Sequence, residues 1–239
     1  MFNRPPALSF GGLGGRAYLA VADAPCCRGC TLIFSFEKRP RSPEEQAMLL
    51  VFIGPPGAGK GTQSKRLCQR YEIIHLSTGD ILRKAKAAGT ELGRIVGPIM
   101  DSGGLVNDEL MVKVVEEAIG RTECRNGFLL DGFPRSIPQA EALDDMLANR
   151  RQRLTAVIEL RVPRAELERR LVNRFYELTD PRPEDRPEAI GHRLDLYERI
   201  TAPLLEYYTD KRLLLSVDGV GSTDEVFSRI TGGLPSVHR

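Results

Sequence analysis

The sequence predicts an α/β fold in which helices cover both faces of a parallel sheet. Apolar runs of strand length alternate along the chain with longer segments of helical pattern. This alternation favours parallel pairing, because a helix between two strands carries the chain back to the end where the first strand began. A glycine-rich segment, residues 54–62, joins the first strand to the first helix. Ligands in such folds bind beyond the carboxyl ends of the strands, where this segment is expected to lie.

The composition is that of a globular protein. The 239 residues suffice for one sizeable α/β domain with insertions, or for two small domains. The formal net charge of +2 does not favour a nucleic-acid partner. No stretch approaches the roughly 18 apolar residues of a membrane span. The five cysteines are an odd number and favour isolated thiols over a disulfide framework. We therefore expect a cytoplasmic protein with neither a nucleic-acid nor a membrane partner.

Residues 1–47 differ from the rest of the chain and are expected to form a flexible extension. They contain Pro-Pro and Gly-Gly pairs and no sustained helical or strand period. Cys27 and Cys30 form a CxxC pair without a second pair at zinc spacing, so zinc binding is the weaker interpretation. The regular pattern begins at residue 49 and predicts a compact domain over 48–239. One hypothesis is that Met48 is the true initiator, which mass spectrometry of the native N-terminus would test.

Each predicted element follows from a local pattern. Short apolar runs are expected to be strands, and the first of them should be buried. These are Leu49–Ile53, Ile73–Leu76, Phe128–Leu130, Val157–Leu160 and Leu213–Val217. Longer segments between and after them are expected to be helices. These are Lys60–Arg70, Gly79–Ala88, Glu91–Ser102, Asp108–Gly120, Ile137–Arg150, Pro163–Phe175, Pro187–Tyr208 and Thr223–Ile230.

The segment Gly54–Thr62 has the pattern of a phosphate-binding loop, G-x-x-x-x-G-K. Its glycines let several backbone N–H groups point at one anion, and the following helix adds the positive end of its dipole. Lys60 can reach the β- and γ-phosphates of a nucleotide. A strand before the loop and a helix after it are the context that the pattern requires. The segment therefore predicts binding of a nucleoside triphosphate.

The loop departs from the common pattern at one position. Lys60 is followed by Gly61, and the hydroxyl comes one residue later, at Thr62. The Ser or Thr that usually binds magnesium directly after the lysine is therefore missing. This departure disfavours the phosphate-loop proteins that bind magnesium through a Ser or Thr directly after the lysine.

Further motifs follow the loop in order. They are Leu76–Arg83 (LSTGDILR), Gly104–Glu109 (GLVNDE), Gly127–Arg135 (GFLLDGFPR), Ile137–Gln139 (IPQ), Thr201–Leu204 (TAPL) and Val217–Gly219 (VDG). With the loop, this series resembles the adenylate kinase family over residues 48 to about 231. The resemblance implies a phosphate-loop α/β/α fold with a five-stranded parallel sheet. It also implies an insert over about 77–106 that binds the nucleoside monophosphate, and a short lid over about 173–185.

The resemblance implies a reaction and a set of site residues. The reaction is reversible phosphoryl transfer between MgATP and AMP to give two ADP, carried out by a monomer in adenine nucleotide homeostasis. The residues expected to act in catalysis are Lys60, Arg135, Arg174, Arg182 and Arg193. Those expected to bind ATP are Gly57, Ala58, Gly59, Lys60, Gly61, Thr62, Arg174 and Gly221. Those expected to bind AMP are Thr78, Arg83, Gly104, Leu105, Val106, Gly132, Phe133, Pro134, Arg135, Gln139, Arg182 and Arg193. Asp131 resembles the carboxylate that holds Mg²⁺ through water.

The residue types suit this chemistry. The phosphate of AMP is already anionic near neutral pH, so the reaction needs no general base. It needs cations that hold two repelling phosphate groups in line, and the fork of arginine binds phosphate oxygens through two parallel hydrogen bonds. Some positions allow another interpretation. Arg193 suits a solvated helix surface as well as the site, Arg170 suits either equally, and Asp131 can cap a turn.

Two residues bear on the choice of monophosphate. Thr78 and Gln139 match the positions at which adenylate kinases recognise AMP, whereas the related pyrimidine kinases usually have alanine in place of Thr78 and lack the IPQ run. Thr78 and Gln139 therefore favour AMP over UMP or CMP as the acceptor. A UMP/CMP-type kinase is the first alternative. The second is a catalytically weak nucleotide-binding regulatory protein, which would be expected to lack one of the phosphate-binding cations, and none is missing.

The predicted lid is unusual for the family. It contains no cysteine, which excludes a zinc-stapled lid. The run Phe175–Asp180 stands where relatives typically have a second arginine or a small polar turn. Pro181 and Pro183 on either side of Arg182 should make the segment stiffer than a turn that contains glycine.

Overall fold

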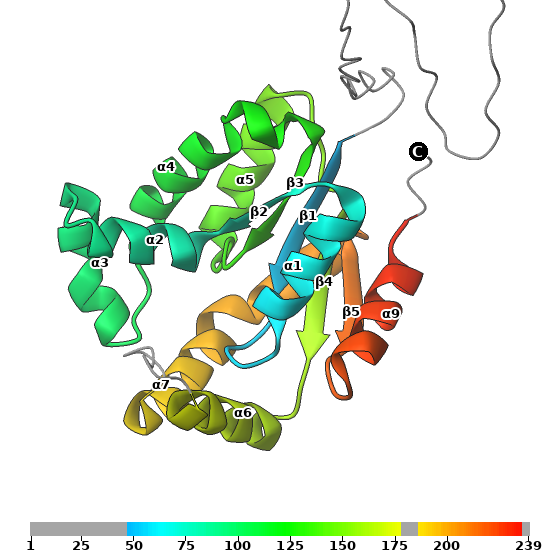
Figure 1. Cartoon of the computed structure of the whole chain (residues 1–239). Coiled ribbons are helices and arrows are strands. Elements are labelled where there is room, and N and C mark those ends of the chain that lie inside the picture. Colours follow the sequence, from blue (N-terminus) through cyan, green and yellow to red (C-terminus); the bar gives the residue numbers. More distant parts are fainter. Residues whose placement is uncertain (1–46, 178–185, 236–239) are drawn as a thin grey trace, which may run out of the picture. The chain divides into compact units, whose positions relative to one another are not determined.

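The computed structural model describes residues 47–177 and 186–235 of the chain. Within them, one sheet has the strand order β2-β3-β1-β4-β5, and all neighbouring strands are parallel (Figure 1). The strands are β1 (Met48–Ile53), β2 (Ile74–Ser77), β3 (Gly127–Asp131), β4 (Ala156–Arg161) and β5 (Leu214–Asp218). The predicted five-stranded parallel sheet is confirmed, and its strand ends differ from the prediction by at most one residue. The predicted extension over 1–47 lies outside the described residues apart from Ala47.

Helices stand at the predicted positions between and after the strands. They are α1 (Lys60–Tyr71), α2 (Thr78–Ala87), α3 (Glu91–Asp101), α4 (Asp108–Ile119), α5 (Ile137–Asn149), α6 (Arg164–Glu177), α7 (Pro187–Leu196), α8 (Pro203–Asp210) and α9 (Thr223–Gly233). A 3₁₀ turn, η1 (Thr122–Asn126), which the sequence analysis did not predict, leads into β3. Polar side chains fix several helix starts; the Asn107 side chain, for example, accepts hydrogen bonds from the first turn of α4. Among the helices of the described part, none is long and apolar enough to cross a membrane.

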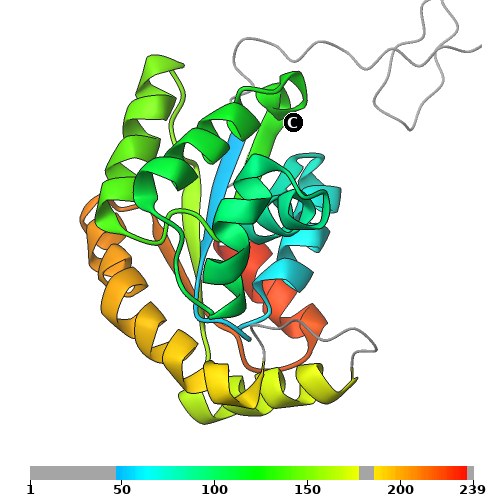
Figure 2. The ribbon, with the colours of Figure 1, turned by 90° about the vertical axis from the view of Figure 1, so that its left-hand side faces the viewer.

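The sheet lies between two layers of helices (Figures 1 and 2). All six residues of β1 are buried, which explains why its sequence is continuously apolar rather than alternating. Leu49, Val51 and Ile53 belong to the core cluster that includes residues of α4, α5 and α8. Met48, Leu50 and Phe52 belong to the cluster that includes residues of α1, α6, α7 and α9. The three-layer arrangement predicted from the sequence is therefore present.

The predicted helix over Pro187–Tyr208 is wrong as a single helix. It is divided into α7, a π-helical segment η3 (Tyr197–Thr201) and α8. The cause lies at Pro203, which has no N–H to donate and whose ring would clash with the carbonyl four residues earlier in a regular α-helix. Just before Pro203 the helix therefore has a wider, π-helical turn, in which the Ala202 N–H donates to the Tyr197 oxygen five residues back, at 2.9 Å.

Helix α6 extends further than predicted. It ends at Glu177 rather than at Phe175, so residues 173–177 of the predicted lid are helical. The rings of Phe175 and Tyr176 meet edge to face in its last turn, with centroids 5.4 Å apart. The remainder of the predicted lid up to residue 185 lies outside the described residues.

The strand order places the phosphate loop at the carboxyl end of the central strand of the sheet. Strand β1 lies between β3 and β4, and the chain runs from β1 to β2 and β3 on one side before it crosses to β4 and β5 on the other. The order of strands therefore reverses beside β1, and ligands bind at such a point in open α/β sheets. The register pairs Asp131 with Phe52 on β1 and with Ser77 on β2. Asp131, the loop after β1 and the start of α2 are therefore neighbours.

Candidate active site

A cavity of about 920 Å³ opens at the carboxyl ends of the strands. Most of its lining comes from the phosphate loop, α1, α2, the segment after α3, the end of β3, and helices α6 and α7, and residues of β2, α3, α4 and α5 complete it. A smaller cavity of about 110 Å³ shares Lys60, Arg135 and Arg193 with it. Ligand pockets usually have volumes of roughly 300–1,000 Å³, so the main cavity has room for more than one small nucleotide group.

The phosphate loop has the backbone conformation that its glycines predict. Gly57 and Gly59 have φ values of 84° and 94°, a region that side chains with a Cβ rarely adopt. At Gly57 the loop also lies against α6, because a Cβ there would stand 3.0 Å from Leu171 Cγ. The Lys60 Nζ donates hydrogen bonds to the carbonyl oxygens of Gly54, at 2.6 Å, and Pro55, at 2.9 Å. The lysine is thereby folded back over the loop, on the side where a phosphate would lie.

The surroundings of Lys60 disfavour its positive charge. Burial lowers the pKa of its ammonium from 10.5 to about 8, an effect that the Asp131 carboxylate opposes and that Arg135, Arg193 and Arg174 reinforce. A phosphate bound in the loop would supply the negative charge that this group of cations lacks.

This pKa predicts a pH dependence of ATP capture. Lys60 is charged below pH 8 and loses its proton as the pH rises through about 8, so kcat/KM for ATP should fall above that value. The phosphates of ATP titrate near pH 6 to 7 and do not contribute to a fall at higher pH. Initial rates between about pH 6.5 and about pH 9.5 would measure the profile. A profile that stays flat through this range would contradict the assigned environment of Lys60.

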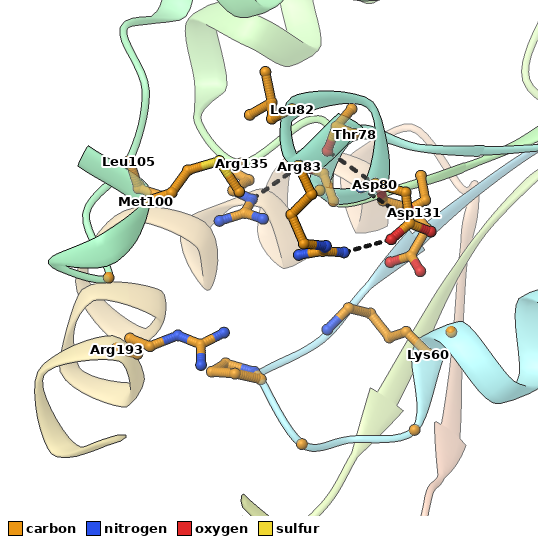
Figure 3. Close-up of a pocket in the computed structure, with 18 of the residues that line it drawn as sticks. Lys60, Thr78, Asp80, Leu82, Arg83, Met100, Leu105, Asp131, Arg135 and Arg193 are labelled. Carbon is orange, nitrogen blue, oxygen red and sulfur yellow. Dashed lines mark hydrogen bonds and ion pairs between the residues drawn. The ribbon is translucent and has the colours of Figure 1, made fainter. Parts of the chain in front are cut away.

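Two arginines and a threonine define the other end of the cavity. Arg83 on α2 pairs with Asp80 at 2.5 Å, and the Arg135 Nε donates to the Gly132 oxygen at 2.9 Å. The Thr78 hydroxyl donates to the backbone oxygen of Asp131 at 3.2 Å. In Figure 3 the side chains of Lys60, Arg83, Arg135 and Arg193 reach toward one space from different elements.

Gly132 makes this arrangement possible. Its φ is 89°, and a Cβ there would lie 2.7 Å from the Thr78 Oγ1 and 3.3 Å from the Arg135 Nη2. Glycine therefore lets the turn after β3 approach both side chains. This accounts physically for the glycine in the DGFPR segment.

Helices α6 and α7 bring arginines to the side opposite α2. Arg174, in the last turn of α6, and Arg193 on α7 both line the cavity. Arg170, one turn before Arg174, lines it too, and the sequence analysis had left this residue open between the site and the helix surface. Arg170 is held by Glu166 at 2.7 Å and donates to the Gly219 oxygen at 3.2 Å.

The residues around Asp131 fit a magnesium ion that keeps its water shell. The Asp131 side chain lines the cavity, is 13% exposed, and has its Oδ2 3.8 Å from the position that a Cβ of Gly61 would occupy. In the described ranges, no group of three or more His, Cys, Asp or Glu side chains could hold a metal. Mg²⁺ commonly binds through one or two carboxylates together with waters and substrate phosphates, which is the kind of site that one carboxylate beside a phosphate loop offers.

Most of the predicted site residues line the main cavity, although their roles are not thereby tested. Those that do are Gly57, Gly59, Lys60, Gly61, Thr62, Thr78, Arg83, Gly104, Leu105, Val106, Asp131, Gly132, Arg135, Gln139, Arg174 and Arg193. Ala58 is instead buried in the core, and Phe133 is fully buried beneath the turn. Pro134 lines only the smaller cavity, and Gly221 lines neither. Arg182 lies outside the described residues.

The cavity also contains residues that the sequence analysis did not assign to it. Examples are Arg66, His75, Asp80, Met100 and Gly103. Two of these carried a usable signal: Asp80 lies inside the LSTGDILR motif, and Gly103 directly precedes Gly104. His75 and Arg66 reach the cavity because β2 and α1 flank the loop, which no local pattern shows.

Comparison with known proteins identifies the family of this chain. The sequence model of the adenylate kinase family matches residues 52–213, more than half of the chain. A relative named adenylate kinase from Sorangium cellulosum (strain So ce56) is 48% identical over 208 residues, which cover 78% of this chain and 96% of the relative. Relatives of the same name from Nitrobacter winogradskyi and Agrobacterium fabrum are also 48% identical, over 75% and 77% of this chain and 89% and 95% of their own lengths. The chain therefore belongs to the adenylate kinase family.

Proposed function

We propose that this adenylate kinase binds MgATP and AMP head to head in the main cavity and converts them reversibly into two ADP. The observation that carries the proposal is the convergence of cations from separate elements on one space between the phosphate loop and α2. Lys60 comes from the loop, Arg83 from α2, Arg135 from the segment after β3, Arg174 from α6 and Arg193 from α7. Such a set suits two polyphosphates whose mutual repulsion must be overcome.

At the acceptor end, Arg83 and Arg135 would bind the phosphate of AMP. Their guanidinium groups line the cavity beside Thr78 and Gln139, which are 1% and 3% exposed. Buried polar groups of this kind discriminate between ligands, because a ligand that leaves them unpaired loses binding energy. The backbone of 104–106 and of Gly132 would complete the acceptor site.

At the donor end, the N–H groups of 57–62 would bind the phosphates of ATP, with Lys60 reaching the transferred group. Arg174 and Arg193 would balance the charge that develops on this group in the transition state. The backbone contact predicted for Gly221 and the role predicted for Arg182 stay predictions.

Magnesium would be held near Asp131 through water, and it would supply positive charge to the phosphate oxygens of ATP. Asp131 is well placed to orient such waters, because its backbone oxygen is fixed by Thr78 and its carboxylate faces the loop. No side chain is needed to remove a proton, because the attacking phosphate of AMP is already anionic.

A coupled assay with MgATP and a panel of AMP, UMP and CMP tests the proposed reaction. We expect kcat/KM for AMP to exceed the values for UMP and CMP by about tenfold or more, since Thr78 and Gln139 match the positions at which adenylate kinases recognise AMP. A preference for UMP or CMP would favour the pyrimidine kinase instead. Nucleotide binding without turnover of any monophosphate would favour the regulatory protein.

We also propose that the enzyme acts as a monomer in the cytoplasm. The support is the family resemblance, which usually implies a monomer. Light scattering after size-exclusion chromatography measures the first property, and cell fractionation measures the second.

A further inference from the structure

A carboxylate behind the acceptor site holds the side chain of Gln139. Asp108 is the first residue of α4, and its Oδ1 accepts a hydrogen bond from the Gln139 Nε2 at 2.7 Å. Its Oδ2 accepts a hydrogen bond from the Ser136 hydroxyl, also at 2.7 Å. Asp108 does not line the cavity, whereas Gln139 does. Asp108 is therefore placed to act on a ligand only through Gln139.

The other atom of the Gln139 amide is held independently. The backbone N–H of Arg135 donates to the Gln139 Oε1 at 2.8 Å. A backbone N–H can only donate, so the atom that faces it is the amide oxygen, and a carboxylate can only accept, so the atom that faces Asp108 is the nitrogen. The two constraints agree, and together they fix which end of the amide is oxygen and which is nitrogen.

The amide keeps one lone pair and one N–H for a ligand. An amide oxygen has two lone pairs and an amide nitrogen has two hydrogens, and the contacts with Arg135 and Asp108 use one of each. What remains is an acceptor beside a donor. Adenine presents the complement, because its 6-amino group donates and the adjacent ring nitrogens accept. Hypoxanthine presents the reverse on its N1 side, because its 6-oxo group accepts and its N1–H donates.

We propose that Asp108 is a positioning residue for acceptor specificity, which holds the Gln139 amide in the orientation that selects a 6-aminopurine and disfavours a 6-oxopurine. The inference rests on the proposed function, in which Gln139 faces the base of the acceptor. It extends that function, because the discriminating group lies behind the site rather than in it. Loss of Asp108 leaves only Arg135 to orient the amide, which can then rotate toward a 6-oxo group at lower cost.

The test compares AMP with IMP as acceptors for MgATP, because their bases differ only at position 6 and in the proton on N1. In the full chain, Asp108→Ala should lower the ratio of kcat/KM for AMP to kcat/KM for IMP by about tenfold, mainly through a higher KM for AMP. The KM for ATP should not change. Asp108→Asn should also lower the ratio, although by less than Asp108→Ala, since an asparagine amide keeps both contacts but can turn to donate to the Gln139 oxygen, and so no longer requires nitrogen at that position.

Glu109→Ala is the matched control, because Glu109 is the adjacent acidic residue in the same first turn of α4. It removes the same charge from the helix N-terminus without touching Gln139 and should keep the wild-type ratio. The inference is overturned if Asp108→Ala keeps the wild-type ratio, or if Glu109→Ala lowers the ratio as much, since Asp108 would then act only on α4.

Gln139→Ala separates this inference from the proposed function on which it rests. If Gln139→Ala lowers the ratio and Asp108→Ala does not, Gln139 reads the base and only the role of Asp108 is wrong. If Gln139→Ala also keeps the wild-type ratio, the proposed acceptor site itself is wrong. A lower ratio in both Gln139→Ala and Asp108→Ala, with the ratio of Glu109→Ala unchanged, supports the inference.

Discussion

Replacement of Lys60 by methionine should lower kcat by a factor on the order of 10² or more, because it removes a cation directed at the transferred phosphoryl group. Methionine keeps an unbranched chain of similar length, so the change is mainly one of charge. The Lys60 Nζ lies on the phosphate loop itself, 2.6 Å from the Gly54 oxygen, and shares the cavity with Arg135, Arg174 and Arg193. The measurement is the initial rate at saturating MgATP and AMP.

Lys113→Met is the matched control for this substitution. Lys113 is exposed on α4 and does not line either cavity, so its loss should leave kcat unchanged. Thermal unfolding of both variants separates a catalytic defect from a folding defect. A Lys60→Met enzyme that is folded and within about threefold of wild-type kcat would show that the assigned role of Lys60 is wrong.

The strands of this fold could be predicted closely because each contains a short apolar run between polar or glycine-rich segments, and β1, β3 and β4 are also largely buried. Strand β1 is the clearest case. It is buried on both faces, so its sequence is continuously apolar and does not alternate between apolar and polar residues. The division of the helix over Pro187–Tyr208 was missed although Pro203 marks it in the sequence. Helical periodicity continues on both sides of the proline, so the pattern alone favours one helix. Only the hydrogen bond from Ala202 to Tyr197 shows how the chain accommodates the proline.

The site could be predicted where its residues lie within tight motifs and less well where they lie on helices. Arg169 and Arg170 are adjacent and both bond to Glu166, yet only Arg170 lines the cavity. A signal was available, because Arg170 is four residues before Arg174 and residues at that spacing share a helix face. Ala58 shows what a motif leaves open. It lies inside the phosphate loop, but its side chain faces the core, and a loop pattern does not state side-chain directions.

Replacement of Gly93 by alanine should disrupt the acceptor end and raise the KM for AMP by about tenfold or more, while the KM for ATP stays near the wild-type value. Helices α2 and α3 cross so closely that a Cβ at Gly93 would lie 2.1 Å from the Ala85 oxygen and 2.7 Å from the Lys86 Cα. These are backbone atoms and cannot rotate away, so the two helices must separate. Thr78 and Arg83 lie on α2, and both belong to the proposed AMP site. Steady-state kinetics with each nucleotide varied in turn measures the two effects.

Gly191→Ala controls for the general effect of alanine in a helix. Gly191 lies inside α7, and a Cβ there would meet no atom within 4 Å. Its replacement should stabilise the helix by roughly 0.5–1 kcal/mol and leave both KM values unchanged. The same gain in helix propensity acts at Gly93, so any loss there must come from the crossing with α2. If Gly93→Ala binds AMP as well as Gly191→Ala does, then the close contact of α2 and α3 does not position the acceptor site.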